Sequence, residues 1–400
     1  MTKNTHMTHV EDKVLYDGVN GTRQAILALR NLKNKIRSNE GEVSVKWDGA
    51  PSIFAGTDPK DGKFFVAKKG IFNKNPKVYK TFDDIDNDVS GPLAVKLKEC
   101  LTYLPQLGIE GVVQGDFLFG ENDVRTETIE GNTYVVFHPN TIAYAVPNNS
   151  VLADSISKAR IGIVLHTKYT FGDNSDDFAT LTAEYGCDIS TLNKTDDVFV
   201  ISSNMQIPTN NMDISDVSKD LSECGKLFNQ IQSETFTRLQ TSKLPGLIEQ
   251  FNNTYVRQGK DIGDSRRHLS NFITWISSKY EAEIASRKTE RGKSSQRQKL
   301  NELLSFFTDS TSDDVKKIFD LQKHLVSAKI KVINTLDIIN EVKTFVKTVD
   351  GYEATKAEGY VAIDTLGGDA VKLVDRMEFS YNNFSPNILK GWEKPRKENG

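Results

Sequence analysis

The sequence predicts an α+β fold, in which mixed or antiparallel sheets are interrupted by an all-α segment. Short runs of alternating apolar and polar residues fill positions 42–146, and Gly, Asp, Asn and Pro separate these runs. In the second half of the chain apolar residues instead recur at helical spacing, until strand-like sequence returns towards the C-terminal end. We therefore expect a core domain formed by residues 1–213 and 350–400, interrupted by a helical insertion domain at residues 214–349.

In the first half, helical spacing of leucine and isoleucine predicts helices over residues 22–38 and 92–104. Thr22 is placed to cap the first helix, and Pro105 follows the second. Strands are expected at residues 43–46, 52–56, 64–68, 112–119, 133–146, 161–170 and 198–201.

In the second half, the same spacing predicts four helices, and Ser312-Asp313-Asp314 supplies a typical N-terminal cap for the third. These helices are expected over residues 213–240, 269–280, 315–325 and 332–345. Residues 359–364 and 370–374 then form a predicted hairpin, which turns at Gly367-Gly368.

Composition excludes several classes of protein. The 51 basic and 54 acidic residues give a net charge of −3, so any nucleic-acid surface must be local. The three cysteines, at 100, 187 and 224, form no C-x-x-C pair, which argues against a disulfide framework or a zinc site and for a reducing compartment. No run approaches the roughly 18 apolar residues of a membrane span. The N-terminal residues lack a signal-peptide core, so we expect a cytoplasmic protein without membrane segments.

Lys46-Trp47-Asp48-Gly49 follows directly on the predicted strand Val43-Ser44-Val45, so this strand would deliver a lysine amine into a turn. A lysine amine can act as a nucleophile and hold a transferred group covalently. The alternative is a simple β-hairpin, because Asp-Gly is a common pair at the tip of such turns. The tetrapeptide alone is compatible with both interpretations.

Three other residues of the first half are candidates for a nucleotide site. Lys69 follows an apolar strand and either holds a phosphate or marks a solvated strand end. Asp116 lies inside an apolar strand, on the same face as Gln114 and Leu118, and is either a metal ligand or a hydrogen-bond acceptor at a sheet edge. Phe137 either stacks on a purine ring or belongs to the core.

The predicted C-terminal hairpin carries two further candidates. Glu358 stands directly before its first strand, and Lys372 lies within its second strand between Val371 and Leu373. A lysine in an apolar strand indicates an anionic partner such as a phosphate. It can equally lie on the solvated face of an edge strand.

In their order along the chain, these residues resemble the motifs of the covalent nucleotidyltransferase superfamily, and within it the RNA ligases more than the DNA ligases. Lys46-Trp47-Asp48-Gly49 is similar to motif I, which implies that Lys46 is the nucleophile. The other similar positions are Lys69-Gly70, Gly115-Asp116 (motif III), Phe137 at the base-stacking aromatic 21 residues further on, Glu358-Gly359-Tyr360-Val361 (motif IV) and Lys372 (motif V).

The whole chain also resembles an uncharacterised group of bacteriophage proteins that share its blocks at 46–54 and 115–119. That second resemblance implies a viral source, and hence the host cytoplasm.

The resemblance implies a ligase-type nucleotidyltransferase domain that uses ATP and Mg²⁺ and forms lysyl-AMP on Lys46. It places Asp48, Gly49, Lys69, Asp116, Phe137, Glu358 and Lys372 around the nucleotide, with Asp116 and Glu358 also holding Mg²⁺. Phosphates would lie against the lysines, and clustered cations would depress the pKa of Lys46. The adenylate would then pass to a polynucleotide 5′-phosphate, of RNA more than of DNA, and a 3′-hydroxyl would close the bond.

Several positions depart from the family pattern. Pro51 stands where motif I often continues to Arg or Asn, and Val374 replaces the second lysine of motif V, for which Arg376 is a possible substitute. Only 28 residues follow Lys372, too few for an OB-fold domain, which favours an RNA-ligase-like protein. The alternatives are a catalytically degenerate member of the fold with a nucleic-acid-binding or virion-associated role, and an enzyme that transfers nucleotides to a protein or small molecule.

A basic run lies within the expected helical insertion. Its members are Arg287, Lys288, Arg291, Lys293, Arg297 and Lys299, with only Glu290 opposing them. Such a run can follow a phosphate backbone. Gly292 and Ser294-Ser295 also fit a solvated, flexible loop between helices.

Overall fold

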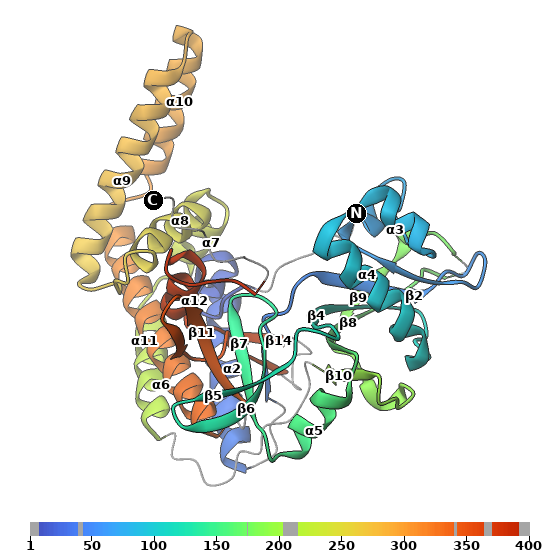
Figure 1. Ribbon diagram of the computed structural model, residues 1–400. Coiled ribbons are helices and arrows are strands. Elements are labelled where there is room, and N and C mark those ends of the chain that lie inside the picture. Colours follow the sequence, from blue (N-terminus) through green and yellow to red (C-terminus); the bar gives the residue numbers. More distant parts are fainter. Residues whose placement is uncertain are drawn as a thin grey trace, which may run out of the picture.

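A computed structural model describes residues 8–38, 43–173, 175–202, 215–339, 342–363 and 370–391 of the chain. These residues form three β-sheets, which we name A, B and C, and a layer of packed helices (Figure 1). The predicted α+β class with mixed and antiparallel sheets is therefore confirmed.

Sheet A consists of short antiparallel strands drawn from both ends of the chain. They are β1 (Val43–Val45), β13 (Tyr360–Ile363) and β14 (Ala370–Leu373), in the order β1-β13-β14. Val45 pairs with Tyr360, which in turn pairs with Leu373. Because β1 and β13 are antiparallel, the chain that leaves β1 runs beside the chain that enters β13.

Sheet B is a mixed sheet with the order β10-β8-β4-β2-β3, and β9 pairs with the far end of β8. Its strands are β2 (Ser52–Thr57), β3 (Phe64–Ala67), β4 (Val112–Phe119), β8 (Ile161–Thr170), β9 (Thr182–Tyr185) and β10 (Val198–Ser202). Val113 and Phe117 of β4 belong to the core under helix α4 (Gly91–Tyr103), whereas Leu118 belongs to another core. Strand alternation thus leaves Gln114 and Asp116 half-buried on the face away from α4, as predicted.

Sheet C is antiparallel throughout, with the order β12-β11-β7-β6-β5. Its strands are β5 (Arg125–Ile129), β6 (Asn132–Phe137), β7 (Ile142–Pro147), β11 (Lys343–Thr348) and β12 (Gly351–Ala354). The prediction of one strand over 133–146 is wrong, because β6 and β7 form a hairpin. Pro139-Asn140 lies at the turn, where proline has no backbone N–H to donate to a strand ladder.

The helical layer combines N-terminal helices with those of the predicted insertion. Its members are α1 (Lys13–Tyr16), α2 (Gly18–Ser38), α6 (Ser215–Phe228), α7 (Ser233–Gln240), α8 (Leu244–Val256), α9 (Ser265–Ser286), α10 (Glu290–Leu304), α11 (Asp309–Ile339) and α12 (Arg376–Phe384). Helix α2 contacts α6, α7 and α11. One hydrophobic cluster continues from these helices to Tyr144 of sheet C and Phe119 at the end of β4. The predicted division into a core and an insertion domain stays a prediction.

The shorter helices lie elsewhere, and 3₁₀ turns follow or separate several strands. They are α3 (Phe82–Asp88), α5 (Val151–Lys158), η1 (Lys69–Phe72), η2 (Leu104–Leu107), η3 (Phe178–Thr180) and η4 (Ile189–Thr191). None of the described helices combines the length and the apolar character that a membrane span requires.

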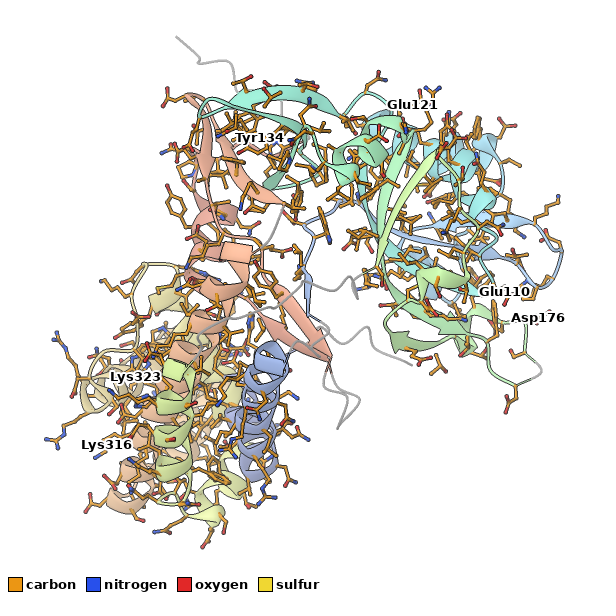
Figure 2. All side chains as sticks on the ribbon, turned by 90° about the horizontal axis from the view of Figure 1, so that it is seen from below. Glu110, Glu121, Tyr134, Asp176, Lys316 and Lys323 are labelled. Atoms are coloured by element: carbon orange, nitrogen blue, oxygen red, sulfur yellow. The ribbon has the colours of Figure 1, made fainter. Side chains whose placement is uncertain are left out.

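The helical layer and sheet B lie at opposite ends of the molecule. In the view from below, Lys316 and Lys323 of α11 mark one end, and Glu110 and Asp176 beside sheet B mark the other (Figure 2). Strand β14 of sheet A lies between them (Figure 1). The segment after β1 crosses from sheet A to sheet B, so its position between the two ends follows from the strand order.

Two predicted boundaries in the helical half are wrong. The helix expected over 213–240 is two helices, α6 and α7, within the described residues. The helices expected over 315–325 and 332–345 are one helix, α11, and Phe345 lies in β11. Val342 and Phe345 continue the helical spacing of α11, but pairing of β11 with β7 and β12 overrides that local pattern.

Candidate active site

Lys46 extends from the end of β1 and contacts Glu358 at the start of β13. Its backbone N–H donates to the carbonyl oxygen of Gly359 at 2.8 Å, which continues the β1–β13 pairing. Its ammonium group forms an ion pair with Oε2 of Glu358, 312 residues away in the sequence. The side chain of Lys46 is 28% exposed and that of Glu358 is 10% exposed. The predicted nucleophile and the predicted metal ligand are therefore in direct contact.

The turn after Lys46 presses tightly against β4. A Cβ atom added at Gly49 would lie 2.6 Å from Cβ of Asp116 and 2.9 Å from the carbonyl oxygen of Phe117, so a larger residue does not fit. This close approach places Asp116 directly beside the turn. The hairpin interpretation of Asp48-Gly49 is wrong, because β1 belongs to sheet A and β2 to sheet B.

Asp48 anchors the turn to the start of β7. Its carboxylate accepts hydrogen bonds from Nδ2 of Asn140 at 2.6 Å and from the backbone N–H groups of Thr141 and Ile142 at 2.8 and 3.2 Å. The backbone N–H of Asp48 donates to the hydroxyl oxygen of Tyr144. The contact with a nucleotide that the resemblance implies for Asp48 does not fit this arrangement, because its oxygens already bind protein donors.

Phe137 is a core residue in this structure. Its ring is 1% exposed and packs against Trp47 and Tyr144 at centroid distances of 6.1 and 5.4 Å, and these two rings also contact each other at 4.6 Å. Phe119 packs against it at 5.0 Å. Neither face of the ring is open to a purine, so the predicted base-stacking role of Phe137 is wrong for this conformation. Phe137 and the rings around it instead pack against Trp47 and so support the turn that follows Lys46.

Asp116 lies on β4 with His166 of β8 beside it. The two strands pair there through an irregular register, and Nε2 of His166 lies 3.7 Å from Oδ2 of Asp116. Both side chains are between a fifth and a third exposed. The charge of Asp116 also acts on Lys46, together with those of Glu358 and Asp48. Asp116 therefore belongs to the same group of charges as the lysine.

Lys372 supplies a second cation beside this group. It lies on β14, where it pairs with Val361 of β13, and its charge interacts with those of Lys46 and Glu358. Within the described part of the chain, its ammonium group forms no hydrogen bond and no ion pair. Burial lowers the pKa of Lys372, and the positive charge of Lys46 lowers it further. An anion such as a phosphate is the partner that would complete this position.

Lys69 is more distant. It is exposed at the first position of η1, directly after the edge strand β3. Phe54 pairs with Ala67, so continuing this register places Lys69 level with Ser52, whose partner on β4 is Asp116. No contact between Lys69 and Lys46, Asp116, Glu358 or Lys372 is found among the described residues.

Residues 4–388 match DUF6267, which is described as a family of unknown function. The chain belongs to DUF6267. No curated protein and no solved structure matches it.

The electrostatics of the DUF6267 site differ from expectation at Lys46. Burial lowers the pKa of Lys46, but the charge of Glu358 and its hydrogen bond outweigh burial, so the pKa lies above its ordinary value of 10.5. The expected depression by neighbouring cations is therefore wrong for the protein without nucleotide. Lys46 is held as an ammonium ion, with Glu358 as the cause.

Two residues that follow the C-terminal hairpin bear on the departures from motif V. Val374 is buried in the core. The guanidinium of Arg376 donates to Oδ2 of Asp12 at 2.9 Å and to Oδ1 of Asn253 at 2.8 Å, in the interface with the helical layer. The guanidinium of Arg376 is therefore engaged by protein partners, although its charge still acts on Lys372.

Tyr144, Asn140 and His166 were not identified from the sequence. Tyr144 and Asn140 hold the Asp48 turn from β7 and from the turn before it, and His166 lies next to Asp116. The signal for Tyr144 and Asn140 is the Pro139-Asn140 turn, which reverses the strand direction towards the motif. A single sequence carries no such signal for His166, because its position depends on an irregular pairing of β8 with β4.

Proposed function

We propose that this DUF6267 protein is an ATP-dependent, RNA-ligase-like enzyme that forms a covalent lysyl-AMP on Lys46. The observation that carries the proposal is the convergence of Lys46, Asp116, Glu358 and Lys372 on one place. These residues lie on, or next to, strands of two sheets, and the Lys46–Glu358 contact joins segments 312 residues apart. A solvated strand end or a hairpin turn would not require that assembly.

The charges fit a nucleoside triphosphate. Among the residues that the structure describes, Lys372 has no anionic partner at hydrogen-bond distance, and it is close enough to Lys46 for their charges to interact. A triphosphate bound against Lys372 would place phosphate oxygens near the Lys46 amine. A clustered pair of cations attracts a phosphate chain and stabilises the charge that develops on the leaving pyrophosphate.

The carboxylates fit Mg²⁺ when phosphate supplies further ligands. Among the described residues, no group of three or more His, Cys, Asp or Glu side chains forms a metal cluster. Mg²⁺ commonly binds through one or two carboxylates and substrate phosphates, and the proposal assigns the carboxylates to Glu358 and Asp116. When bound there, Mg²⁺ would neutralise Glu358, which now keeps Lys46 protonated, and would balance phosphate charge.

The proposed reaction balances as a displacement followed by a transfer. Lys46 loses its proton, and Nζ attacks the α-phosphorus; an N–P bond forms as the P–O bond to pyrophosphate breaks. An oxygen of a polynucleotide 5′-phosphate then attacks the same phosphorus and releases Lys46. Attack by a 3′-hydroxyl on the activated 5′-phosphate joins the strands and releases AMP.

The test is the intact mass of the protein after incubation with ATP and Mg²⁺. We expect wild type to gain one AMP, Lys46→Ala to gain none, and the surface variant Lys158→Ala to match wild type. Prior incubation with pyrophosphate removes adenylate carried over from expression. Absence of an adduct from folded, pyrophosphate-treated wild type with each common nucleoside triphosphate would rule out the proposed activity.

A second candidate is a degenerate nucleotidyltransferase-fold protein that binds nucleic acid or belongs to a virion. Buried Val374 in place of the second motif V lysine favours it, as does the engagement of Arg376 with Asp12. This candidate predicts nucleotide or nucleic-acid binding without an adduct, so the mass experiment separates the two.

A further inference from the structure

Helices α9 and α10 form an antiparallel hairpin that projects from the helical layer (Figure 1). At about 1.5 Å per residue, the 22 residues of α9 extend for about 33 Å. Its buried residues all lie between His268 and Tyr280, where α9 contacts α8 and α11. The outer part of the hairpin therefore lies beyond the packed base. We call residues 281–299 the arm.

The part of the arm that includes the start of α10 has almost no apolar surface. Residues 287–299 include no aliphatic and no aromatic side chain, and within this stretch only Gln296 is buried. Thr289 caps the helix by accepting a hydrogen bond from the N–H of Gly292 at 3.1 Å. The apolar residues of α10, Leu300, Leu303 and Leu304, all lie at its C-terminal end, so burial of apolar side chains holds that end and does not explain the sequence of the first ten residues.

The hairpin is basic although the protein is acidic. Residues 265–304 hold nine basic and four acidic side chains, a net charge of +5, whereas the whole chain carries −3. Lys293 pairs with Glu290 at 2.8 Å. In the described structure no ion pair neutralises the other basic side chains of the run, which are Arg287, Lys288, Arg291, Arg297 and Lys299. The flexible-loop interpretation of this run is wrong, because most of it is helical.

We propose that the arm binds the phosphate backbone of a polynucleotide. Its unpaired cations are interspersed with exposed neutral donors, Ser294 and Ser295, and serine hydroxyls also bind phosphate oxygens. Along α10, Arg291 and Lys299 are about 12 Å apart, a length that covers about three phosphates of one strand at 3.4 Å each. A membrane surface is a poor partner, because the arm offers no apolar side chains for insertion at its basic end.

The identity of this polynucleotide as a ligation substrate rests on the proposed function, but the binding itself does not need Lys46. The test compares full-length wild type with a variant in which all five unpaired cations are changed to Gln: R287Q, K288Q, R291Q, R297Q and K299Q. A control variant with the same change in net charge carries R23Q, R30Q, K158Q, K194Q and K219Q, all at exposed positions.

Binding is measured by fluorescence anisotropy with labelled single-stranded RNA, single-stranded DNA and duplex DNA over a salt series. We expect the arm variant to bind at least about tenfold more weakly than wild type, with the control close to wild type. The plot of log K against log salt for single strands should be less steep for the arm variant than for wild type by about 3 to 4, because each of the five lost phosphate contacts contributes ~0.7 to the slope. Thermal unfolding establishes that both variants are folded.

Equal binding by the arm variant and the control, or no binding of any probe by folded wild type, overturns the proposal. The intact-mass assay with ATP keeps this result separate from the proposed function, because the arm variant should form the Lys46 adduct as wild type does. An arm-dependent affinity without any adduct would retain the arm as a nucleic-acid surface and reject the ligase activity.

Discussion

The replacement Asp48→Ala tests whether this carboxylate anchors the turn or contacts the nucleotide. The carboxylate accepts three hydrogen bonds, and two of the donors are the backbone N–H groups of Thr141 and Ile142, which are 0% and 2% exposed. Each buried donor left without an acceptor costs about 1–3 kcal/mol, and Asn140 can turn its amide towards water. We therefore expect the free energy of unfolding to fall by about 3–5 kcal/mol, which is a large part of the stability of a typical domain.

The assay is urea unfolding followed by the fluorescence of the three tryptophans, of which Trp47 lies next to Asp48. Hydrogen exchange at the amides of Thr141 and Ile142 measures the same loss locally. Asp48→Asn retains one acceptor oxygen and should lose roughly half as much as Asp48→Ala. The control is Asp188→Ala, which removes an exposed carboxylate with a single backbone partner at Ser190 and should change stability little.

The anchoring role would be refuted by a loss below about 1 kcal/mol in Asp48→Ala together with unchanged protection of the two amides. If that variant also failed to bind ATP, the nucleotide contact implied by the resemblance would replace the anchoring role. A destabilised variant that still forms the adduct at low temperature would support the structure.

Three other perturbations have signs that the structure fixes. Glu358→Gln removes the charge that raises the pKa of Lys46, so the amine should react with an acylating reagent at lower pH; an unchanged pH profile of Lys46 labelling, read by peptide mass, would contradict this. Gly359→Ala places a Cβ 2.3 Å from the carbonyl oxygen of Leu373, so this variant should lose about 1–3 kcal/mol of stability and should shift Lys46. A variant with the stability and the adduct yield of wild type would be evidence against this tight packing. Burial and neighbouring carboxylates raise the pKa of Glu99 to about 7, so the contribution of Glu99 to stability falls as the pH rises from about 4.5 through 7. The variant Glu99→Gln should lack this fall and should be more stable than wild type at pH 8 by about 1 kcal/mol after solvent screening. Equal urea midpoints for the two proteins at both pH 5 and pH 8 would exclude this role of Glu99.

The elements that the sequence predicts well are those fixed by local pattern. Strands β4 and β8 have the predicted bounds: β4 lies between Gly111 and Gly120, and β8 lies between Arg160 and the Phe171-Gly172 pair. The pairing of β1 with β13 was not predicted as such, since nothing local to residues 43–45 indicates a partner more than 300 residues away. The resemblance to a family supplied that link for Lys46 and Glu358, and the structure then placed them in contact.

The roles of single residues were less predictable than their neighbourhood. Asp48 and Phe137 both lie beside the Lys46 turn, yet one anchors its backbone and the other packs behind it. Motif spacing locates a residue along a strand, but hydrogen bonds and packing decide which way its side chain faces. The same limit explains Arg376, whose charge is neutralised by Asp12 from the opposite end of the chain. Composition alone likewise could not separate a helical arm from a loop at residues 287–299.

The helical layer also holds the C-terminal half of the site in position. His9 forms a β-bridge with Lys372. Two residues after His9, Glu11 forms an ion pair at 2.7 Å with the buried Lys329 of α11, which connects this N-terminal segment to the helices. Removing one partner of such a buried pair costs about 3–5 kcal/mol, so this tie is strong. Helix α11 contacts α9 at the base of the arm as well. One helix therefore connects the base of the proposed polynucleotide arm to the strand that carries Lys372, which accounts for a long helical segment between two halves of a single site.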